Sequence, residues 1–292
     1  MTKAIFLLLG TIQQNSATKL VELPEIYQLF NNNVMSLVPS KRIISLCSDF
    51  GTQDYRLSSL KAEVLKSNPQ ISILDISHEV TPFDLTEAAF LVSNAIPHFP
   101  SQSIHVVWVF NTSDDQGIIV AKWNDQFIIA PDNGLIGLIT SHDPELEIFR
   151  ISDDCYSYKK RIADTIKILL EQEQLGSYFE LMHNPVHKIS LNPVYQKDRI
   201  QARVIYIDRY GNIIFNIKRE PFKEVCVGRN FSFNTPAHQI ISNFNLQQLE
   251  RENGAFYVNF TDSGYLKLAL CGAEASSTLD IKKDDTIQIL FE

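Results

Sequence analysis

The sequence predicts an α/β domain with a mainly parallel sheet and flanking helices, followed by a smaller all-β, barrel-like domain. Its length of 292 residues is sufficient for two domains. Short apolar runs alternate with segments of helical periodicity over residues 41–190, whereas residues 199–292 contain short strand-like runs separated by turns. The stretch 183–197 contains prolines and has no clear periodicity, so we expect the domain boundary there.

The elements of the α/β domain follow one another in the order that a parallel sheet with helical crossovers requires. Apolar and β-branched runs predict strands, and apolar residues three or four positions apart predict helices. Asp84 is a suitable N-cap for the second helix, and Pro97 ends it. The predicted elements are the strand Arg42–Cys47, the helix Tyr55–Ser67, the strand Ile71–Ile76, the helix Leu85–Ile96, the strand Ser103–Phe110, a hairpin of Ile118–Trp123 and Phe127–Ala130, and the helix Lys159–Glu173.

The C-terminal domain is predicted to consist of strands. Its apolar runs are short and lie close together with turn residues between them, which is typical of a small barrel or sandwich. The predicted strands are Gln201–Ile207, Ile213–Ile217, Asn230–Asn234, Ala255–Phe260, Tyr265–Leu270 and Thr286–Phe291.

Composition narrows the classes of partner. The formal net charge is -8, and a protein that neutralises phosphates usually carries a basic face, so we expect no nucleic-acid partner. No apolar run approaches the ~20 residues that span a bilayer, so we expect no membrane partner. The four cysteines are widely spaced without a Cys-x-x-Cys pair. This favours buried free thiols in a cytoplasmic protein over a metal site or disulfides.

Residues 1–40 precede the first predicted strand. We interpret them as an N-terminal extension that is either disordered or lies upstream of a true start at Met35. The apolar stretch Ala4–Ile12 is short, and no clear small-residue cleavage site follows it, so it does not indicate secretion.

Acidic and amide residues follow several predicted strands or lie in turns. Asp49 follows the first strand, Asn133 lies in a Pro-Asp-Asn-Gly segment, and Asp208 and Asn212 share one turn. Ligands of open parallel sheets gather at the carboxyl ends of strands, where the Asp49 carboxylate can accept both hydroxyls of a ribose. Alternatively, Asp49 caps the next helix or shapes the turn, and Asn133 belongs to an ordinary turn. For His78 we favour a structural role over that of a general base.

Seven segments occur in an order and spacing typical of one family. They are Ser48-Asp49-Phe50-Gly51, Asp75-Ile76-Ser77-His78-Glu79-Val80, Pro82-Phe83-Asp84, Phe99-Pro100, Ile104-His105-Val106, Pro131-Asp132-Asn133-Gly134-Leu135 and Ile207-Asp208-Arg209-Tyr210-Gly211-Asn212. Together they resemble the S-adenosylmethionine (SAM) hydroxide adenosyltransferase family, whose halide-using branch contains the fluorinases and chlorinases. The resemblance extends from about Arg42 to the C-terminus.

The resemblance implies roles for the matching residues. Asp49 would hold the ribose hydroxyls, Phe83 would lie against the nucleoside, and Asp208 would reach the amino acid end of SAM. Tyr210 and Asn212 would frame the adenine. The remaining members of the expected substrate-binding set are Phe50, Asp84, Phe110, Asn133 and Ser263.

The sequence departs from the hydrolytic branch of this family where water should be activated. That branch has an Asp after the third strand, an Arg seven residues later and a His in a Phe-His-Gly-Arg-Asp segment. Here Phe110 stands at the Asp position, no Arg occurs between Arg56 and Arg150, and the segment 156–161 has no His. The Ser-Arg or Ser-Phe pair that the family places near the methionine carboxylate is replaced by Thr261-Asp262-Ser263-Gly264. The catalytic residues are therefore unknown; the candidates near the nucleophile are Phe110, Asn111, Thr112 and Ser113.

The resemblance implies a SAM hydrolase that transfers the adenosyl group to water and needs no cofactor beyond SAM as substrate. The missing water-activating set keeps two alternatives open, a SAM- or adenosine-binding protein without turnover and a SAM-dependent halogenase. The expected partner is the small molecule SAM or adenosine. The resemblance also implies a homotrimer with sites between subunits.

Overall fold

The structure, a computed structural model, describes residues 42–109, 117–152, 156–171, 175–188, 192–235, 240–244 and 253–292. The predicted extension 1–40 and the candidate residues Phe110, Asn111, Thr112 and Ser113 lie outside the described residues. Among the helices of the described ranges, none is long and apolar enough to cross a membrane.

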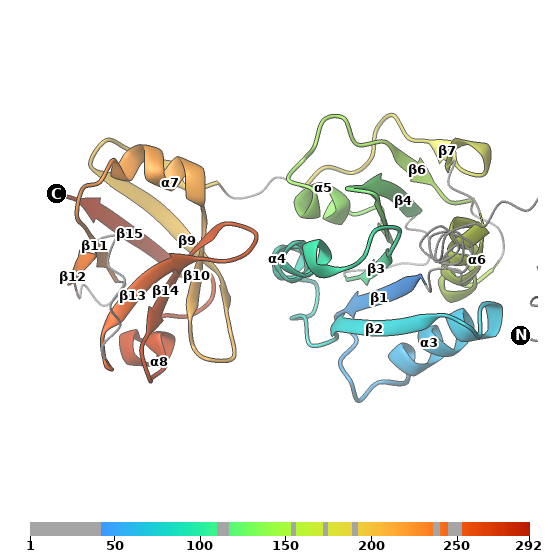
Figure 1. The fold of residues 1–292 in the computed structure, drawn as a ribbon, viewed down its shortest axis with the longest axis horizontal. Helices are drawn as coiled ribbons and strands as arrows, with labels where there is room; N and C mark the ends of the chain where they lie inside the picture. The colour runs from blue at the N-terminus through green and yellow to red at the C-terminus, as the bar shows by residue number, and fades with distance from the viewer. Residues whose placement is uncertain are drawn as a thin grey trace, which may run out of the picture. The chain divides into compact units, whose positions relative to one another are not determined.

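The N-terminal part is built on a seven-stranded sheet with the strand order β2-β1-β3-β5-β4-β6-β7 (Figure 1). β1, β2, β3 and β5 are parallel, as expected, and β4, β6 and β7 continue the sheet with antiparallel pairs. The strands are β1 (Ile43–Ser48), β2 (Ser72–Ser77), β3 (Ile104–Trp108), β4 (Ile118–Trp123), β5 (Gln126–Pro131), β6 (Ile148–Arg150) and β7 (Glu180–Leu181).

The strand order creates a topological switch point at β1. The chain passes from β1 through a helix to β2 on one side, and then through a second helix to β3 on the other side of β1. Loops that leave β1 and β3 in opposite directions open a crevice at their carboxyl ends, where doubly wound sheets bind ligands. Asp49, directly after β1, lies at this position.

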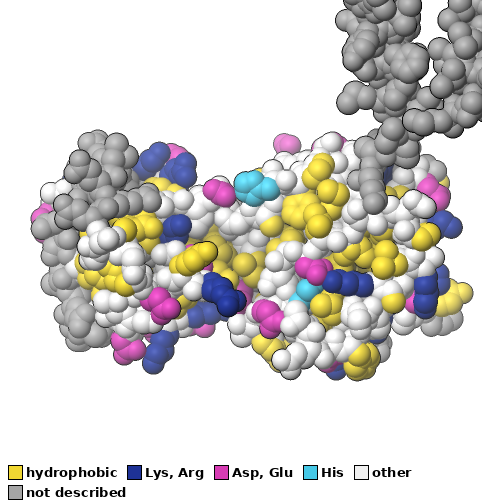
Figure 2. Space-filling model, turned by 60° about the horizontal axis from the view of Figure 1, so that its bottom comes forward, with side chains coloured by type: hydrophobic (Ala, Val, Ile, Leu, Met, Phe, Trp, Pro, Cys, Tyr) yellow, Lys and Arg dark blue, Asp and Glu magenta, His cyan; other side chains and the backbone are white. Residues whose placement is uncertain are grey.

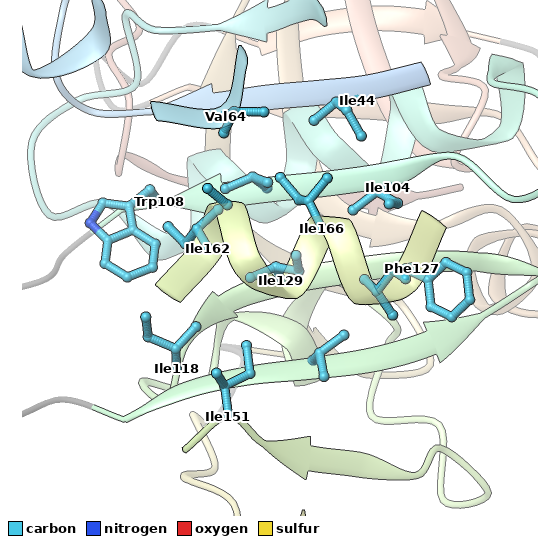
Figure 3. Packing of buried hydrophobic residues seen from close by; sticks show 14 of the residues in the cluster. Ile44, Val64, Ile104, Trp108, Ile118, Phe127, Ile129, Ile151, Ile162 and Ile166 are labelled. Atoms are coloured by element: carbon cyan, nitrogen blue, oxygen red, sulfur yellow. The ribbon is translucent and has the colours of Figure 1, made fainter. Parts of the chain in front are cut away.

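Helices cover both faces of the sheet, because strand residues alternate between two cores. Val106 and Trp108 of β3 pack with α3 and α6, whereas Val107 and Val109 pack with α4 and α5. Figure 3 shows the first core, in which side chains from β3 lie beside those of α6. The helices are α3 (Tyr55–Ser67), α4 (Leu85–Ala95), the 3-10 turn η1 (Ile96–His98), α5 (Leu135–Ile139), α6 (Tyr158–Glu171) and the 3-10 turn η2 (Leu175–Ser177).

The C-terminal part is a curled antiparallel sheet with the order β12-β11-β15-β9-β10-β14-β13, and β8 pairs with β9. Its core is rich in phenylalanine, and the rings of Phe215 and Phe233 stack with centroids 5.5 Å apart. The elements are β8 (Val194–Tyr195), β9 (Arg199–Ile207), β10 (Ile213–Lys218), α7 (Arg219–Cys226), β11 (Phe231–Asn234), β12 (Ile240–Phe244), β13 (Phe256–Phe260), β14 (Tyr265–Leu270), α8 (Ala275–Leu279) and β15 (Thr286–Phe291).

A small aromatic cluster joins α4 to the C-terminal sheet. The ring of Phe90 lies 4.9 Å from that of Tyr206 and 5.7 Å from that of Tyr265. Ile205 and Ile214 complete this buried cluster. The C-terminal sheet is therefore packed against the helix that precedes β3.

The predicted fold class is confirmed: an α/β sheet with flanking helices is followed by a curled antiparallel sheet. The structure adds elements that we did not predict, namely the short strands β6, β7 and β8, the strand β12 and the short helices α5, α7 and α8. The predicted strand over Ser103–Phe110 is shorter at its C-terminus and ends at Trp108.

Candidate functional site

The Asp49 carboxylate at the switch point fixes a distant backbone segment. Its Oδ2 accepts a hydrogen bond of 3.0 Å from the backbone N–H of Phe83, 34 residues further along the chain. Asp49 does not cap the following helix. The N-cap of α3 is Asp54, whose side chain accepts a hydrogen bond from Arg56 N. Asp49 therefore connects the end of β1 to the segment before α4.

Phe83 has two unusual properties. Its φ of 70° lies in the left-handed region, which is uncommon for an aromatic residue. Its side chain is 61% exposed. Such a backbone costs on the order of 1–3 kcal/mol and persists when surrounding structure imposes it, which occurs often at ligand sites. Asp49 supplies part of that constraint.

His78 is buried next to the end of β1, and its two ring nitrogens face Ser48 and Asp75. Its Nδ1 is 2.7 Å from Ser48 Oγ, and its Nε2 is 3.0 Å from Asp75 Oδ1. Its backbone carbonyl accepts from Gly51 N at 2.7 Å. Partial burial would raise the pKa of Asp75, but hydrogen bonds from Lys61 and His78 lower it below its ordinary value. This arrangement gives His78 a structural role at the end of β1.

A hollow of about 360 Å³ opens beside the Asp49 turn. Glu79 Oε1 accepts from both the backbone N and the Oγ1 of Thr52 and so fixes the rim. The hollow is open to solvent, and none of the residues expected to bind substrate lines it. The lining residues are Thr52, Gln53, Asp54, Tyr55, Leu57, Ser58 and Lys61.

The Asp132-Asn133 turn after β5 binds both flanks of segment 110–116. Asn133 Nδ2 donates to the carbonyl of Val109 at 2.9 Å, and Asp132 N donates to the carbonyl of Gly117 at 2.8 Å. Asn133 is buried, and its Oδ1 accepts from Leu135 N to open α5. The turn therefore fixes the points where the chain leaves and re-enters the sheet around the candidate nucleophile segment.

Asp84, the residue after Phe83, has two roles. Its Oδ1 accepts from Glu87 N and caps α4, as predicted from the sequence. Its Oδ2 lies 2.5 Å from Lys283 Nζ, which also pairs with the Glu87 carboxylate. Burial alone would lower the pKa of Lys283, but the hydrogen bonds and charges of Asp84 and Glu87 raise it above its ordinary value.

Asp208 organises the turn between β9 and β10. Its Oδ1 accepts from the backbone N–H groups of Tyr210 and Asn212, at 2.9 and 3.0 Å, and its Oδ2 accepts from Asn212 Nδ2 at 2.8 Å. Gly211 has a φ of +72°, and a Cβ there would lie 2.5 Å from Glu274 Cβ. The result is a rigid turn that leaves the Tyr210 side chain 79% exposed.

Ser263 lies in the turn between β13 and β14. Its backbone N–H donates to Asn94 Oδ1 of α4 at 3.0 Å, and its Oγ lies 3.3 Å from Thr261 Oγ1. Lys218 Nζ donates to the Ser263 carbonyl at 3.0 Å. The neighbouring Asp262 is exposed and lies 3.2 Å from His98 Nε2. Lys218 was missed in the sequence analysis, where the only available signal was a lysine directly after an apolar strand.

The candidate residues form two groups on different sheets. Asp49, Phe83 and Asn133 lie at or near the carboxyl edge of the parallel strands, and Asp84 follows them into α4. Phe50 comes from the same turn, and its ring packs against the core beneath α3 and α6. Asp208, Tyr210, Asn212 and Ser263 belong to turns of the C-terminal sheet.

The chain is a two-part α/β and antiparallel protein with polar side chains at the switch point of its parallel sheet. Open α/β sheets bind their ligands outside the carboxyl ends of the strands at such a point. Sequence profiles identify the family. The SAM hydroxide adenosyltransferase N-terminal domain matches residues 44–168, and the C-terminal domain of the same name matches residues 202–288. The chain belongs to the SAM hydroxide adenosyltransferase family.

Individual relatives agree with this assignment. The chain is 27% identical to an (R)-S-adenosyl-L-methionine hydrolase of Methanocaldococcus jannaschii, with 85% of this chain and 96% of the relative covered. It is 23% identical to the protein of the same name from Thermus thermophilus, with 85% and 100% covered. A fluorinase of Actinoplanes is 23% identical over 38% of this chain and 45% of its own length.

Two solved structures share the fold. An uncharacterised conserved protein from Thermotoga maritima superposes with a TM-score of 0.74 at 23% identity, covering 85% of this chain and 99% of its own. A conserved hypothetical protein from Thermus thermophilus gives a TM-score of 0.65 at 21% identity, covering 86% and 100%.

Proposed function

We propose that the protein binds SAM and transfers its adenosyl group to water, giving adenosine and methionine. The observation that carries the proposal is the arrangement of Asp49 and Phe83 at the switch point. In this proposal the carboxylate of Asp49 accepts the ribose hydroxyls, and the ring of Phe83, which is 61% exposed, lies against the nucleoside. The names of the relatives from Methanocaldococcus jannaschii and Thermus thermophilus support the reaction.

The proposed reaction is a single displacement. A water oxygen attacks C5′ of SAM, the C5′–S bond breaks, and its electron pair passes to sulfur, which leaves as the neutral thioether of methionine. The attacking water loses one proton to the solvent. Because a sulfonium needs neither acid nor redox chemistry to leave, we propose that no cofactor takes part. The protein's contribution is to position and partly desolvate water in line with the C–S bond.

We propose that segment 110–116 lies on the path of the nucleophile, with Phe110, Asn111, Thr112 and Ser113 as its candidates. The support is indirect: Asn133 and Asp132 fix the flanks of this segment at the carboxyl edge of the sheet. None of these four side chains is a strong base at neutral pH, and a positioned acid or base contributes about 10²–10⁴-fold. Hydrolysis should therefore be slow compared with relatives that carry an Asp-Arg-His set.

We further propose a homotrimer in which the Asp208–Asn212 turn of one subunit completes the Asp49 site of the next. The rigid turn leaves 79% of Tyr210 exposed, and a ligand held only by the α/β edge would leave one adenine face in water. A repeated head-to-tail contact closes into a ring. Light scattering at micromolar concentration should give three times the subunit mass, and a monomer would contradict the shared site.

We place the protein in the cytoplasm. Cys47, Cys226 and Cys271 are free thiols, which suits a reducing compartment. Cys47 is also unreactive, because burial raises the pKa of its thiol to about 12. Among the three described cysteines, a thiol reagent should therefore spare Cys47 and label Cys271 before Cys226.

A specific observation favours a second candidate, a SAM- or adenosine-binding protein without turnover. Residues 57–149 contain no arginine, so this part of the chain lacks a guanidinium that could polarise a water. Binding would then persist without product formation.

One experiment separates these candidates. The protein is incubated with SAM and chloride, and adenosine, methionine and 5′-chloro-5′-deoxyadenosine are separated by chromatography, with Asp49→Ala as control. Adenosine and methionine in equal amounts would support hydrolysis, and the chlorinated nucleoside would support a halogenase. Binding of adenosine by calorimetry without product would support the second candidate. Absence of binding at millimolar adenosine and SAM would overturn all three.

A further inference from the structure

A one-residue shift between β1 and β2 places a histidine beside the turn that follows β1. The two parallel strands are in regular register up to Leu46 and Asp75, and the register then shifts by one residue. Without the shift, Ser48 would lie opposite the residue before His78. With it, Ser48 lies beside His78 itself, and the two side chains share one face of the sheet. Such β-bulges occur often next to binding sites, where they redirect a side chain.

The imidazole of His78 lies at the centre of a short row of polar side chains. Its Nδ1 is 2.7 Å from Ser48 Oγ, and its Nε2 is 3.0 Å from Asp75 Oδ1. The other oxygen of Asp75 accepts from Lys61 Nζ at 2.6 Å. Ser48 and His78 are 2% and 5% exposed, whereas Lys61 and Asp75 reach the surface. Figure 2 shows a face of the molecule on which acidic and basic side chains lie beside each other, as they do in this pair.

His78 holds the turn of Asp49 on both sides. Its side chain contacts Ser48, whose Oγ also accepts from Phe50 N at 3.4 Å. Its backbone carbonyl accepts from Gly51 N at 2.7 Å. Asp49 lies between these contacts, so the orientation of its carboxylate depends on the position of the imidazole.

The order of the three side chains differs from that of nucleophilic triads. In those, the hydroxyl lies at Nε2 of the histidine and the carboxylate lies at Nδ1. Here Ser48 lies at Nδ1 and Asp75 at Nε2. Ser48 is also buried, so its hydroxyl is not accessible to a substrate. The arrangement therefore suits a fixed orientation of the turn and not covalent catalysis.

We propose that His78 is a positioning residue for ribose binding, which orients the Asp49 carboxylate through Ser48. In this arrangement Asp75 holds the imidazole in the form with hydrogen on Nε2, so that Nδ1 accepts from the Ser48 hydroxyl. Ser48 Oγ in turn accepts from Phe50 N. The inference rests on the proposed function, because it takes a nucleoside as the ligand of Asp49. A buried group that does not touch the ligand then sets the preference for a ribose with both hydroxyls.

The experiment measures how strongly each variant prefers a ribose with hydroxyls. Calorimetry gives the dissociation constants of adenosine and of 2′,3′-dideoxyadenosine, and their ratio is the hydroxyl preference. His78→Asn keeps a polar atom near the position of Nδ1, and His78→Gln keeps one near that of Nε2. A hydrogen bond to a charged group changes affinity by about 10- to 100-fold. His78→Gln should lower the preference by about 10-fold, the lower end of this range, whereas His78→Asn should keep most of it.

Two further variants and a control complete the design. Ser48→Ala removes only the hydroxyl and should lower the preference as His78→Gln does, so the inference stays testable if His78→Gln is poorly folded by circular dichroism. Asp49→Ala should abolish the preference. His183→Asn changes an exposed histidine outside both loops and should change neither constant. A merely structural role of His78 predicts losses of stability with an unchanged preference.

NMR of protein labelled with ¹⁵N-histidine adds a second readout, because it distinguishes a protonated from an unprotonated ring nitrogen. The His78 signals are assigned by their absence in His78→Gln. Nδ1 of His78 should be unprotonated, as an acceptor from Ser48 requires. Hydrogen at Nδ1 would overturn the inference.

The calorimetric outcomes separate the inference from the proposed function. If the wild type binds neither nucleoside, the proposed function fails. If it binds both equally, the ribose role of Asp49 fails and the inference fails with it. If the wild type prefers adenosine and both His78→Gln and Ser48→Ala keep that preference, or if His78→Asn loses as much as His78→Gln, the His78 inference alone fails.

Discussion

At the scale of single residues, Asp49 has a structural role, the hydrogen bond from Phe83 N, and a proposed role in ribose binding. Two substitutions distinguish these roles. Asp49→Asn keeps an oxygen that can accept from Phe83 N but loses the charge, whereas Asp49→Ala loses both. We expect both variants to weaken adenosine binding by about 2–3 kcal/mol, the scale of charge-assisted hydrogen bonds. Only Asp49→Ala should also lower the free energy of unfolding. Calorimetry and urea titration measure the two effects, and unchanged adenosine affinity in a folded variant would assign Asp49 to the turn alone.

Phe83 allows a test of stored strain. Glycine adopts a φ of 70° without penalty, so Phe83→Gly relieves the backbone strain, although glycine also increases the entropy of the unfolded chain. We expect the free energy of unfolding to stay equal or to rise by up to about 1 kcal/mol. Adenosine affinity should fall, because the exposed ring is lost. Phe83→Ala is the matched control, since it removes the ring and keeps the strain; greater stability of the alanine variant would contradict the strain argument.

The sequence predicted the residues of the switch-point turn better than their contacts. Asp49 and Asn133 could be selected because their types and places after strands are visible in the chain. The strained φ of Phe83 could not be predicted, since a hydrogen bond to a residue 34 positions away supplies part of the constraint. The environment of Lys218 depends on the pairing of Lys218 with Tyr265 between β10 and β14, which no local pattern specifies.

At the scale of elements, β3 contains a buried histidine whose protonation opposes folding. His105 is fully buried, with its Nδ1 2.6 Å from Ser45 Oγ of β1 and its Nε2 3.2 Å from Gln126 Oε1. Burial lowers its pKa from 6.5 to about 4. Between these values the unfolded chain binds more protons than the native one, so its contribution to stability is complete above pH 6.5 and is lost as the pH falls toward 4.

We therefore expect acidification from pH 6.5 to pH 4 to remove roughly 3 kcal/mol of unfolding free energy through His105, from a shift of that size. Urea titrations across this range measure the loss in the wild type and in His105→Gln, which cannot titrate. The variant should start from a lower stability and show a shallower dependence on pH. Parallel curves for the two proteins would assign the acid sensitivity to other groups.

Elements with their own periodicity were predictable, and elements that depend on neighbours were not. α3 extends over Tyr55–Ser67 as predicted, because Leu57, Leu60 and Val64 form a buried stripe at helical spacing. By contrast, β6 has three residues and β7 has two, and each exists because an adjacent strand offers hydrogen bonds. α7 begins with Arg-Glu-Pro, a sequence that suits either a turn or a first helical turn.

At the scale of the whole described chain, Lys283 links the C-terminal part to α4. Its side chain is 24% exposed and pairs with Asp84 and Glu87, which are 23% and 8% exposed. Lys283→Met would leave two neighbouring carboxylates partly buried without their cation. We expect a loss of about 1–3 kcal/mol of unfolding free energy, reduced from the fully buried case by solvent screening.

Urea titration of Lys283→Met measures this loss, and limited proteolysis locates it. Cleavage should increase in the stretch 183–197 if the C-terminal part is held less firmly against α4. Lys282→Met is the matched control, because Lys282 is 79% exposed and its Nζ lies 3.9 Å from a carboxylate oxygen of Asp280. Equal stability of the two variants would show that the Lys283 pairs contribute nothing measurable.

Two consecutive residues, Phe83 and Asp84, connect the switch point to the C-terminal part of the chain. The backbone of Phe83 is bound to Asp49 at the switch point, and the side chain of Asp84 is bound to Lys283 near the C-terminus. Because Phe83 and Asp84 are adjacent, we expect nucleoside binding at the switch point and the attachment of the C-terminal part through Lys283 to be coupled. A ligand that binds more tightly when Lys283 is engaged must, by thermodynamic reciprocity, strengthen that engagement by the same factor. The resistance of the C-terminal part to proteolysis would then report on nucleoside binding at the switch point, although the C-terminal part does not contact Asp49 through Lys283.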